Sequence, residues 1–597
     1  FETVVNTYDA NSTEYGKMNP RLIKSEHADS LTNVMTVTKL AYGDYDCLVT
    51  KLVSKTVRKS TVTEGERTTY SYSNFLTKEK YVLGLMDAEL TAKYQRDGRI
   101  GRTTKAIVIT RRLANTAWKT EYEYDEKCRL VCRTSCRGSV GKFNTSSPSK
   151  TSSGTSVFID TESDNTKMVS EVRYEYDDFG NVLSERTANF GASEYVGSSR
   201  TYTSDGHFLT SETDALGRVT CYADYNRFGK PERIVNHHGD TTKVSYDALG
   251  NVLRTESPDG TVTTRTLAWG GTGTYTVTES SNVAPTTVTH YDGIGRKVHT
   301  ENLRFDGQWQ KTDYAYDSKG LLSRETMPYR GSGPTAWIYY SYDSYGRSTI
   351  VSTPDKTTRR IYSGNTVTEW RNGISKTVKY DALGNAAQVE DQGGSITYNL
   401  RNDGQPSSVT TRGVTTTFGY DSYGRRIRID DPSAGTQTDT TAWNADGTSV
   451  RTQTNPNGQI VSYFDKFGRV TKTDRLGEYS TSYSYDSYGR LVSMVSTNGT
   501  AKTYTYDRYD RVLTEKETVP DGKWLLKSYA YGVGNRVNGI RYTAQSGDVA
   551  TENYLYSNGR GVGIVLSEGT VVMRLEEEND FGMPLRVTTG EVTREYG

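Results

Sequence analysis

The sequence predicts an all-β protein built as one long antiparallel ribbon of short repeats. A phrase such as YDSYGR or YDALGN returns about every 21 residues, and a second turn falls near the middle of many repeats. No stretch longer than a dozen residues combines helical periodicity with capping residues. We therefore interpret the 597-residue chain as a repeat array and not as a string of average domains.

The composition is typical of a folded β protein without a thick aliphatic core. Only 34% of the residues are hydrophobic and the mean hydropathy is −0.70, yet 11% are aromatic and 45 are Tyr. Disordered chains lack aromatic and β-branched residues, whereas Tyr, Val and Thr recur here between turns that contain Gly. We expect the chain to fold with an inner face of Tyr, Thr and Val.

Each position of the repeated phrase has a mechanical interpretation. The Asp can cap its own turn by accepting backbone N–H bonds, and the Gly supplies the positive φ that closes the turn. A Tyr-x-Tyr pair before the Asp places two rings on one face of a strand. The Arg is expected to lie on a neighbouring ring or to meet the turn Asp. The clearest copies contain the structural motif residues Tyr176, Asp177, Gly180, Tyr246, Asp247, Gly250, Tyr291, Asp292, Gly295, Arg296, Tyr342, Asp343, Gly346, Arg347, Tyr420, Asp421, Gly424, Arg425, Tyr485, Asp486, Gly489 and Arg490.

The spacing of the turns sets the length of the strands. The motif glycines Gly384, Gly404, Gly424, Gly447, Gly468 and Gly489 lie 20, 20, 23, 21 and 21 residues apart. Between motif turns stand Asp-Gly or Asn-Gly pairs, which are strong hairpin signals, at Asp259-Gly260, Asp306-Gly307, Asn457-Gly458, Asn498-Gly499 and Asp521-Gly522. Each repeat is therefore predicted to be two strands of about seven or eight residues in a continuous antiparallel meander.

The chain is predicted to have two regions. Residues 1–120 are interpreted as divergent N-terminal repeats, and residues 121–597 as the clear array, with a flexible low-complexity insertion at about 137–156. Leu83 to Tyr94 is the nearest candidate for a helix. About 36 strands at about 4.8 Å each would make a flat ribbon about 170 Å long, so the ribbon should twist, curl or close around a wide, wet interior.

The charge pattern excludes several partners. Lys and Arg number 73 against 72 Asp and Glu, and no basic block favours nucleic acid or a membrane surface. No apolar stretch approaches the roughly 20 residues of a membrane span. The longest acidic run, Glu576 to Glu578, is interpreted as a solvated strand end. The chain begins at Phe1 without Met or a signal peptide, which indicates an excerpt or a processed piece.

The residues that could bind a metal or carry catalysis are few. Cys128, Cys132 and Cys136 recur every fourth residue, which leaves a metal site, a local disulfide and free thiols open. His237-His238 and His290 are interpreted as surface or strand residues. Asp160, Glu162 and Asp164 lack the Gly and distal Glu of a calcium loop. Common catalytic signatures are missing from the sequence, so we predict no catalytic residue, no cofactor and no enzyme activity.

The phrases YDSYGR, YDALGN and YDGIGR at this spacing resemble the YD repeats of the RHS family, across about residues 121–597. That family includes Rhs polymorphic toxins, wall-associated contact toxins, the C components of Tc toxins and the YD shell of teneurins. The resemblance implies a spiralled β-ribbon that forms a hollow shell, or cocoon, which in the bacterial members holds a toxin domain. Those members end the shell with an Asp-Pro-x-Gly self-cleavage motif, whereas Asp431-Pro432 is followed here by Ser433-Ala434.

Two functions follow from the resemblance. The first is a non-catalytic shell that encapsulates a toxin or effector cargo of a bacterial polymorphic toxin, secreted or at the cell surface, with a delivery apparatus as a further partner. The alternative is cell-surface adhesion or recognition, in which rows of Tyr stack on glycan rings. Cross-strand packing explains the same Tyr rows without a ligand. A cargo domain beyond Gly597 would favour the shell, and a membrane anchor with binding modules would favour adhesion.

Overall fold

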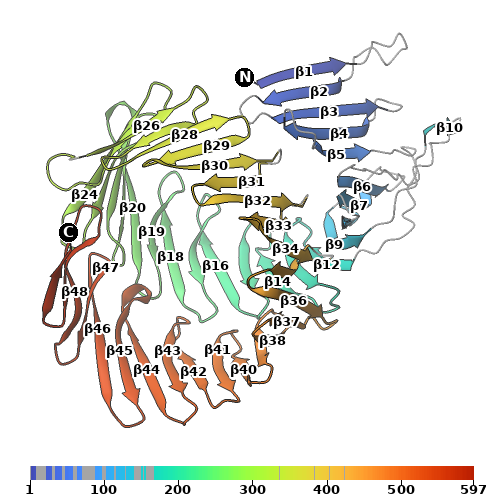
Figure 1. Ribbon diagram of the computed structural model, residues 1–597. Coiled ribbons are helices and arrows are strands. Elements are labelled where there is room, and N and C mark those ends of the chain that lie inside the picture. Colours follow the sequence, from blue (N-terminus) through green and yellow to red (C-terminus); the bar gives the residue numbers. More distant parts are fainter. Residues whose placement is uncertain are drawn as a thin grey trace. The chain divides into compact units, whose positions relative to one another are not determined.

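The computed structural model consists of β-hairpins that follow one another along the chain (Figure 1). It describes residues 2–8, 22–29, 34–42, 48–57, 63–69, 88–96, 103–112, 116–127, 129–139, 150–151, 154–155, 167–334, 336–381, 384–401, 404–421 and 424–596. The chain divides into two compact units, each made of two separate stretches. Unit 1 comprises Phe1–Ser199 and Arg360–Val470, and unit 2 comprises Arg200–Arg359 and Thr471–Gly597.

Almost every regular element is a short strand. The strands of the first 200 residues are β1 (Glu2–Tyr8), β2 (Leu22–Asp29), β3 (Val34–Tyr42), β4 (Leu48–Val57), β5 (Thr63–Thr69), β6 (Ala88–Arg96), β7 (Thr103–Arg112), β8 (Thr116–Tyr124), β9 (Leu130–Ser139), β10 (Lys150–Thr151), β11 (Gly154–Thr155), β12 (Lys167–Tyr176), β13 (Val182–Asn189) and β14 (Val196–Tyr202). The next strands are β15 (Leu209–Thr213), β16 (Val219–Tyr225), β17 (Pro231–Val235), β18 (Thr241–Tyr246), β19 (Val252–Glu256), β20 (Val262–Trp269), β21 (Tyr275–Ser281), β22 (Thr287–Tyr291), β23 (Lys297–Leu303), β24 (Trp309–Tyr316), β25 (Leu322–Thr326), β26 (Trp337–Tyr342), β27 (Ser348–Ser352) and β28 (Thr357–Ser363).

The pattern continues to the end of the described chain. These strands are β29 (Thr366–Arg371), β30 (Ile374–Tyr380), β31 (Ala386–Asp391), β32 (Gly394–Leu400), β33 (Pro406–Thr411), β34 (Val414–Tyr420), β35 (Arg426–Asp431), β36 (Gly435–Trp443), β37 (Ser449–Asn455), β38 (Gly458–Phe464), β39 (Val470–Arg475), β40 (Tyr479–Tyr485), β41 (Leu491–Ser496), β42 (Ala501–Tyr506), β43 (Val512–Thr518), β44 (Trp524–Tyr531), β45 (Val537–Ala544), β46 (Val549–Ser557), β47 (Arg560–Leu566), β48 (Val571–Glu578), β49 (Pro584–Thr589) and β50 (Val592–Glu595). Two 3₁₀ turns, η3 (Gly271–Gly273) and η4 (Val533–Asn535), interrupt the series.

Neighbouring strands pair in antiparallel register, as the turn spacing predicts. In the pair β40 and β41, for example, Tyr483 lies opposite Met494, and the register shifts by one residue between Ser484 and Tyr485. The same shift occurs at Tyr246 and Tyr342, the last strand residue before a motif turn. A bulge at this position follows from closing the hairpin with a left-handed residue, because one strand then carries an extra residue.

The N-terminal part departs from the predicted meander in two places. Strands β5 and β6 pair in parallel, with Arg67 opposite Glu89, and β9 pairs directly with β12, with Arg133 opposite Val172. The β10–β11 hairpin is a separate two-stranded sheet inside the predicted insertion. The helix proposed for Leu83 to Tyr94 is wrong in its described part, because residues 88–96 form β6 and pair with β7 along their whole length. Ladder pairing outweighs the local helical pattern there.

The hydrophobic core is thin, as the composition indicates. Most strand residues are half-buried, and the buried apolar side chains are scattered singly, among them Val172, Ala188, Val277 and Leu575. Packing is therefore provided by rings and long side chains that lie flat on the sheet rather than by an aliphatic interior. Among the described residues, no helix is long and apolar enough to cross a membrane.

The three cysteines whose side chains the structure describes form no disulfide. Cys132 and Cys136 lie on β9 and Cys221 lies on β16. Cys128 lies outside the described residues. Of the alternatives that the sequence left open, a disulfide between Cys132 and Cys136 does not form in the described part of the chain.

Candidate functional site

The motif turns are built by one Asp, one Gly and one Arg. In the copy between β40 and β41, Oδ1 of Asp486 accepts the backbone N–H of Arg490 at 2.9 Å, and Oδ2 accepts Nε–H of the same Arg490 at 2.7 Å. Gly489 has a φ of 81° and donates its N–H to the Asp486 carbonyl at 3.0 Å. The Asp486 carboxylate thus stabilises the turn through the backbone of Arg490 and also fixes the Arg490 side chain.

The other predicted copies have the same arrangement. Oδ1 of Asp177, Asp247, Asp292, Asp343 and Asp421 accepts the backbone N–H four residues later at 2.8–2.9 Å. The φ angles of Gly180, Gly250, Gly295, Gly346 and Gly424 are 95°, 81°, 84°, 80° and 74°. Where Arg follows the Gly, as in Arg296, Arg347 and Arg425, its Nε–H donates to the second Asp oxygen at 2.7–2.8 Å.

These hydrogen bonds favour the charged form of the motif carboxylates. The backbone N–H of Arg296 is the largest influence on Asp292 and lowers the pKa of that carboxyl below its usual value. Burial alone would raise the pKa of Asp486, but the backbone N–H and guanidinium of Arg490 outweigh it, so that this pKa is also lowered. Asp292 and Asp486 are therefore ionised turn formers.

The motif Tyr fastens its repeat to the previous one in at least four of the six predicted copies. Its hydroxyl donates to the carbonyl of the residue that opens the strand after the preceding motif turn: Tyr176 to Leu130 at 2.7 Å, Tyr246 to Pro231 at 3.0 Å, Tyr342 to Leu322 at 2.8 Å and Tyr420 to Pro406 at 2.6 Å. Tyr291 instead stacks on Tyr275, with ring centroids 4.6 Å apart. Neighbouring repeats thereby hold these rings, which agrees with the packing interpretation of the Tyr rows. We call the hydrogen bond from a motif Tyr hydroxyl to the backbone of the preceding repeat the Tyr clasp.

The motif Arg covers the ring of the next repeat. The guanidinium carbon of Arg296 lies 4.6 Å from the ring centroid of Tyr316, and that of Arg490 lies 4.6 Å from the ring centroid of Tyr506. The Arg thus meets both the turn Asp and a neighbouring ring, the two alternatives that the sequence left open. The motif Arg thus links the turn of its own repeat to the Tyr ring of the next repeat.

In unit 2, turns that lie far apart in the sequence meet along a line that we call the seam. The hydroxyl of Tyr509 donates to the Pro258 carbonyl at 3.0 Å, and Nδ2 of Asn558 donates to the Arg304 carbonyl at 2.8 Å. Nε of Arg330 donates to Asp580 Oδ1 at 2.8 Å. In each pair a turn in the middle of an earlier repeat meets a motif turn of a later repeat. Figure 1 shows the two stretches, with β18 to β20 in green and β42 to β46 in orange and red.

Unit 1 has a seam of the same kind. The backbone N–H of Ser193, in the turn after β13, donates to the carbonyl of Ala445 in the motif turn before β37, at 2.7 Å. The ring of Phe190 stacks on Trp443 with centroids 3.7 Å apart, although Phe190 has a φ of 49°, in the left-handed region. A bulky side chain rarely adopts that backbone conformation, so the stack with Trp443 helps to hold it.

Residues 464–501 and 485–523 match the family model described as RHS Repeat. The matched segment contains the motif turns at Asp465, Asp486 and Asp507. This segment of the chain therefore consists of RHS repeats. No curated protein matches the sequence of the chain.

Solved structures similar to this chain include chains of Tc toxin assemblies. A crystal structure titled TcdB2-TccC3-Cdc42 is 10% identical with a TM-score of 0.36, and the match covers 98% of this chain and 51% of that one. A structure of the Photorhabdus luminescens Tc holotoxin pore is also 10% identical with a TM-score of 0.36, covering 93% of this chain and 50% of that one. The chain thus spans about half the length of the solved chains that it matches.

Glu578 anchors the unit 2 seam between RHS repeats. This residue is 2% exposed and forms ion pairs with Arg304 from the earlier stretch and with Arg560 from the neighbouring strand. Its backbone carbonyl accepts Nη2–H of Arg330 at 2.7 Å. The expectation that Glu576 to Glu578 is a solvated strand end is therefore wrong for Glu578, because two guanidinium groups from other turns cover it.

His237 and His238 also lie in this seam rather than on an open surface. Nε2 of His238 lies 2.9 Å from Oδ1 of Asp510, and Nε2 of His237 lies 3.4 Å from Oδ2. Burial lowers the pKa of His237, with a smaller contribution from His238. Asp510 stands where other RHS repeats have Gly and has a φ of 62°.

This trio is a group that could hold a metal ion, because the potential ligand atoms of the three side chains lie within 4.8 Å of one another. Two imidazoles and a carboxylate suit zinc. Nη1 of Arg490, however, already donates to Asp510 Oδ1 at 2.6 Å. The contacts of Asp510 are therefore explained by polar links between side chains at the seam at least as well as by a metal site.

The remaining sequence candidates do not join a common site. Asp431 lies in the hairpin turn between β35 and β36, where the Ser433 side chain and backbone hold its pKa to about 2. Asp160, Glu162 and Asp164 lie outside the described residues. His290 packs beside His299, with ring centroids 5.4 Å apart.

Sequence reasoning missed the seam as a whole. Its members are spread over stretches that the repeat period does not link, and the signal in the sequence is a departure from the motif. The clearest departures are Phe190 at a tight turn and Asp510 in place of Gly.

Proposed function

We propose that this chain is a length of a toxin-associated shell, in which the ribbon of RHS repeats winds as a spiral wall around a cargo polypeptide. The observation that carries the proposal is the seam. In each unit, mid-repeat turns of the earlier stretch meet motif turns of the later stretch, and the bonded residues lie between 248 and 275 positions apart.

The two edges that meet at the seam are different edges of the ribbon. In the described hairpins that meet at the seam, successive strands are antiparallel, so the turns between motif copies lie on one edge and the motif turns on the other. A contact between unlike surfaces that recurs at a nearly constant offset generates an open helical arrangement and not a closed pair. A ribbon joined to itself every twelve or thirteen repeats, by the approximate 21-residue period, is therefore expected to wind as a spiral.

The side chains of the wall also suit this role. Ladder hydrogen bonds hold the strands together along the ribbon, and Tyr clasps and seam ion pairs join repeats and stretches without a thick core. A wall of this kind can be wide and can leave polar Tyr and Thr groups facing water. We propose that the wall itself is non-catalytic, that it acts in a secreted or surface-delivered particle, and that any enzymatic chemistry belongs to the cargo.

Protease protection of a cargo tests the proposal. The complete natural protein is compared with its flanking non-repeat polypeptide expressed alone, under limited proteolysis. We expect the flanking polypeptide to resist digestion only in the complete protein, and to lose that resistance when Glu578→Ala weakens the seam. Lys523→Ala, which removes the exposed ion pair with Asp521 and leaves the Asp521 bond to the Lys523 backbone N–H in place, is the matched control. Equal digestion of the polypeptide in both contexts, or a natural gene without such a polypeptide, would overturn the proposal.

A further inference from the structure

Arg536 is a motif arginine whose usual partner is missing. It belongs to the repeat that begins at Tyr531, and it stands between η4 and β45. In other copies the Arg side chain donates to an Asp four residues earlier, as Arg490 does to Asp486 and Arg511 to Asp507, both at 2.7 Å. The residue four positions before Arg536 is Gly532, so this turn has no carboxylate to neutralise its guanidinium.

The guanidinium of Arg536 has no other anionic partner in the described part of the chain. No described carboxylate lies within ion-pair distance of it, and its Nη2 atom is buried without a hydrogen bond. The guanidinium carbon lies 5.0 Å from the ring centroid of Tyr556, so the ring covers one face of the charge. The Tyr556 hydroxyl is engaged elsewhere, donating to the Val537 carbonyl at 2.9 Å.

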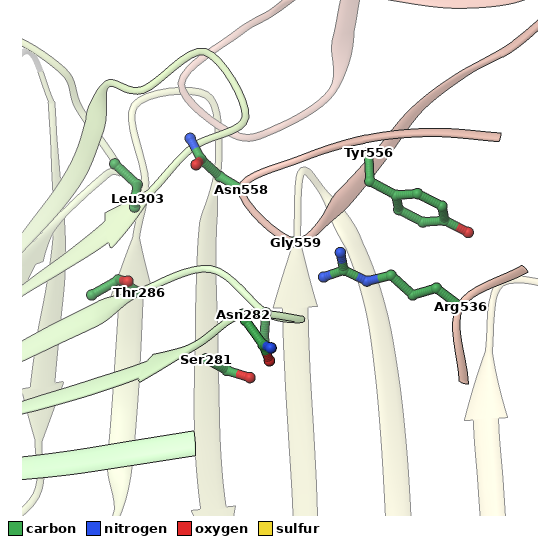
Figure 2. A pocket seen from close by; sticks show the side chains of 9 residues that line it. Ser281, Asn282, Thr286, Leu303, Arg536, Tyr556, Asn558 and Gly559 are labelled. Atoms are coloured by element: carbon green, nitrogen blue, oxygen red, sulfur yellow. The ribbon is translucent and has the colours of Figure 1, made fainter. Parts of the chain in front are cut away.

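Arg536 borders a cavity of about 270 Å³ in the seam of unit 2. Figure 2 shows its side chain reaching into the space between Tyr556 on one side and Ser281 and Asn282 on the other. None of the residues that line the cavity is acidic. Ser281 Oγ accepts the backbone N–H of Val283 at 3.2 Å, a bond that leaves the hydroxyl proton of Ser281 able to donate.

A buried cationic N–H group without a hydrogen-bond acceptor, such as Nη2 of the half-buried Arg536, is costly, and such groups are normally paired or hydrogen-bonded. The planar guanidinium matches the two oxygens of a carboxylate, which is the group that the motif supplies in other repeats. We propose that this cavity is a binding site for a small organic carboxylate, whose oxygens take the place of the missing motif Asp beside Arg536. Ser281 is positioned to donate a further hydrogen bond, and Tyr556 holds the guanidinium in place.

The test uses the complete chain and acetate as the probe. Thermal unfolding is followed by calorimetry in sodium acetate and in sodium chloride of the same ionic strength. A ligand that binds only the folded state raises the midpoint as its concentration rises. We expect acetate to raise the midpoint of the natural chain in a saturable way, and not to raise that of Arg536→Gln. The matched control is Arg511→Gln, which removes a paired motif Arg and should keep the acetate response.

A second variant places the carboxylate back in the chain. Gly532→Asp would bring a Cβ within 2.6 Å of the amide of Asn538, so it is made together with Asn538→Ala, and Asn538→Ala alone is the reference. We expect the double variant to melt at a higher temperature than the reference without acetate and to lose the acetate response. The absence of an acetate effect in the natural chain, or an equal effect in Arg536→Gln, would overturn the proposal and leave water as the occupant.

Discussion

The hydroxyl of Tyr506 donates a hydrogen bond of 2.6 Å to the carbonyl oxygen of Leu491, the residue that opens the strand after the preceding motif turn. Arg490 ends that turn and lies over the same Tyr506 ring. One tyrosine therefore contacts both the backbone and the side chain of the repeat before it. Each hairpin of the array is therefore stabilised by contacts with the hairpin that precedes it.

Replacing Tyr506 with Phe removes the hydroxyl of this clasp and keeps the ring under Arg490. The free energy of unfolding should fall by about 1 kcal/mol, the usual net value of one hydrogen bond. Urea denaturation measures the change. Tyr339→Phe, at a half-exposed ring on β26, is the control and should leave the free energy unaltered. Equal losses in both variants would contradict the role of the clasp.

Replacing Gly522 with Ala should destabilise unit 2 through the backbone alone. Gly522 has a φ of 81°, and a Cβ at this position would meet no atom within 4 Å, so no clash contributes. An L-residue in the left-handed region costs about 1–2 kcal/mol. Gly333, which has ordinary φ and equally open surroundings, is the control for the added methyl group. Thermal unfolding of both variants separates backbone strain from packing, and a Gly522→Ala midpoint as high as that of Gly333→Ala would disprove the strain.

Acid should weaken the motif turns. The pKa of Asp292 and of Asp486 is lower in the folded chain than its ordinary value, so the unfolded chain binds protons first as the pH falls. Their stabilisation is fully present above the unfolded pKa of about 4 and is lost as the pH falls through the folded value. Urea unfolding from about pH 6 down to about pH 2 should show this loss, and Asp292→Asn should make it smaller. A stability that rises over this interval would refute the assignment.

Removing Glu578 should have the largest effect of any single change in the seam. Glu578→Ala leaves Arg304 and Arg560 without their shared anion, and breaking a buried ion pair in this way costs about 3–5 kcal/mol. Lys523→Ala breaks the pair with Asp521, whose side chain is 52% exposed against 78% for Lys523, and keeps the Asp521 bond to the Lys523 backbone N–H, so no change in stability is expected. Chemical denaturation of the two variants measures the difference in their free energies of unfolding. If the contacts of Glu578 were superficial, both variants would unfold at the same denaturant concentration.

Local chemistry made the repeat predictable. The motif Asp, Gly and Arg fall within five consecutive residues, as in the turn from Asp486 to Arg490. The groups that form its hydrogen bonds are therefore neighbours in the sequence. The Tyr clasp was not foreseen as a hydrogen bond, although the two-residue spacing placed its ring correctly on one face. The helix expected near Leu83 failed because β7 offered β6 a pairing partner that a local pattern cannot reveal.

The amino-acid sequence by itself determined the strands, the turns and their period, because each depends on residues a few positions apart. The tertiary structure alone decided which turns meet across about 250 residues, and with them the burial of Glu578 and the contacts of His238 with Asp510. It also placed the unpaired Arg536 against a cavity. The physical reason is that the twist and curl of many successive strands add up along the ribbon and decide which distant turns meet. The entropy of closing such a long loop is offset by the whole ribbon, so no pattern of neighbouring residues predicts these contacts.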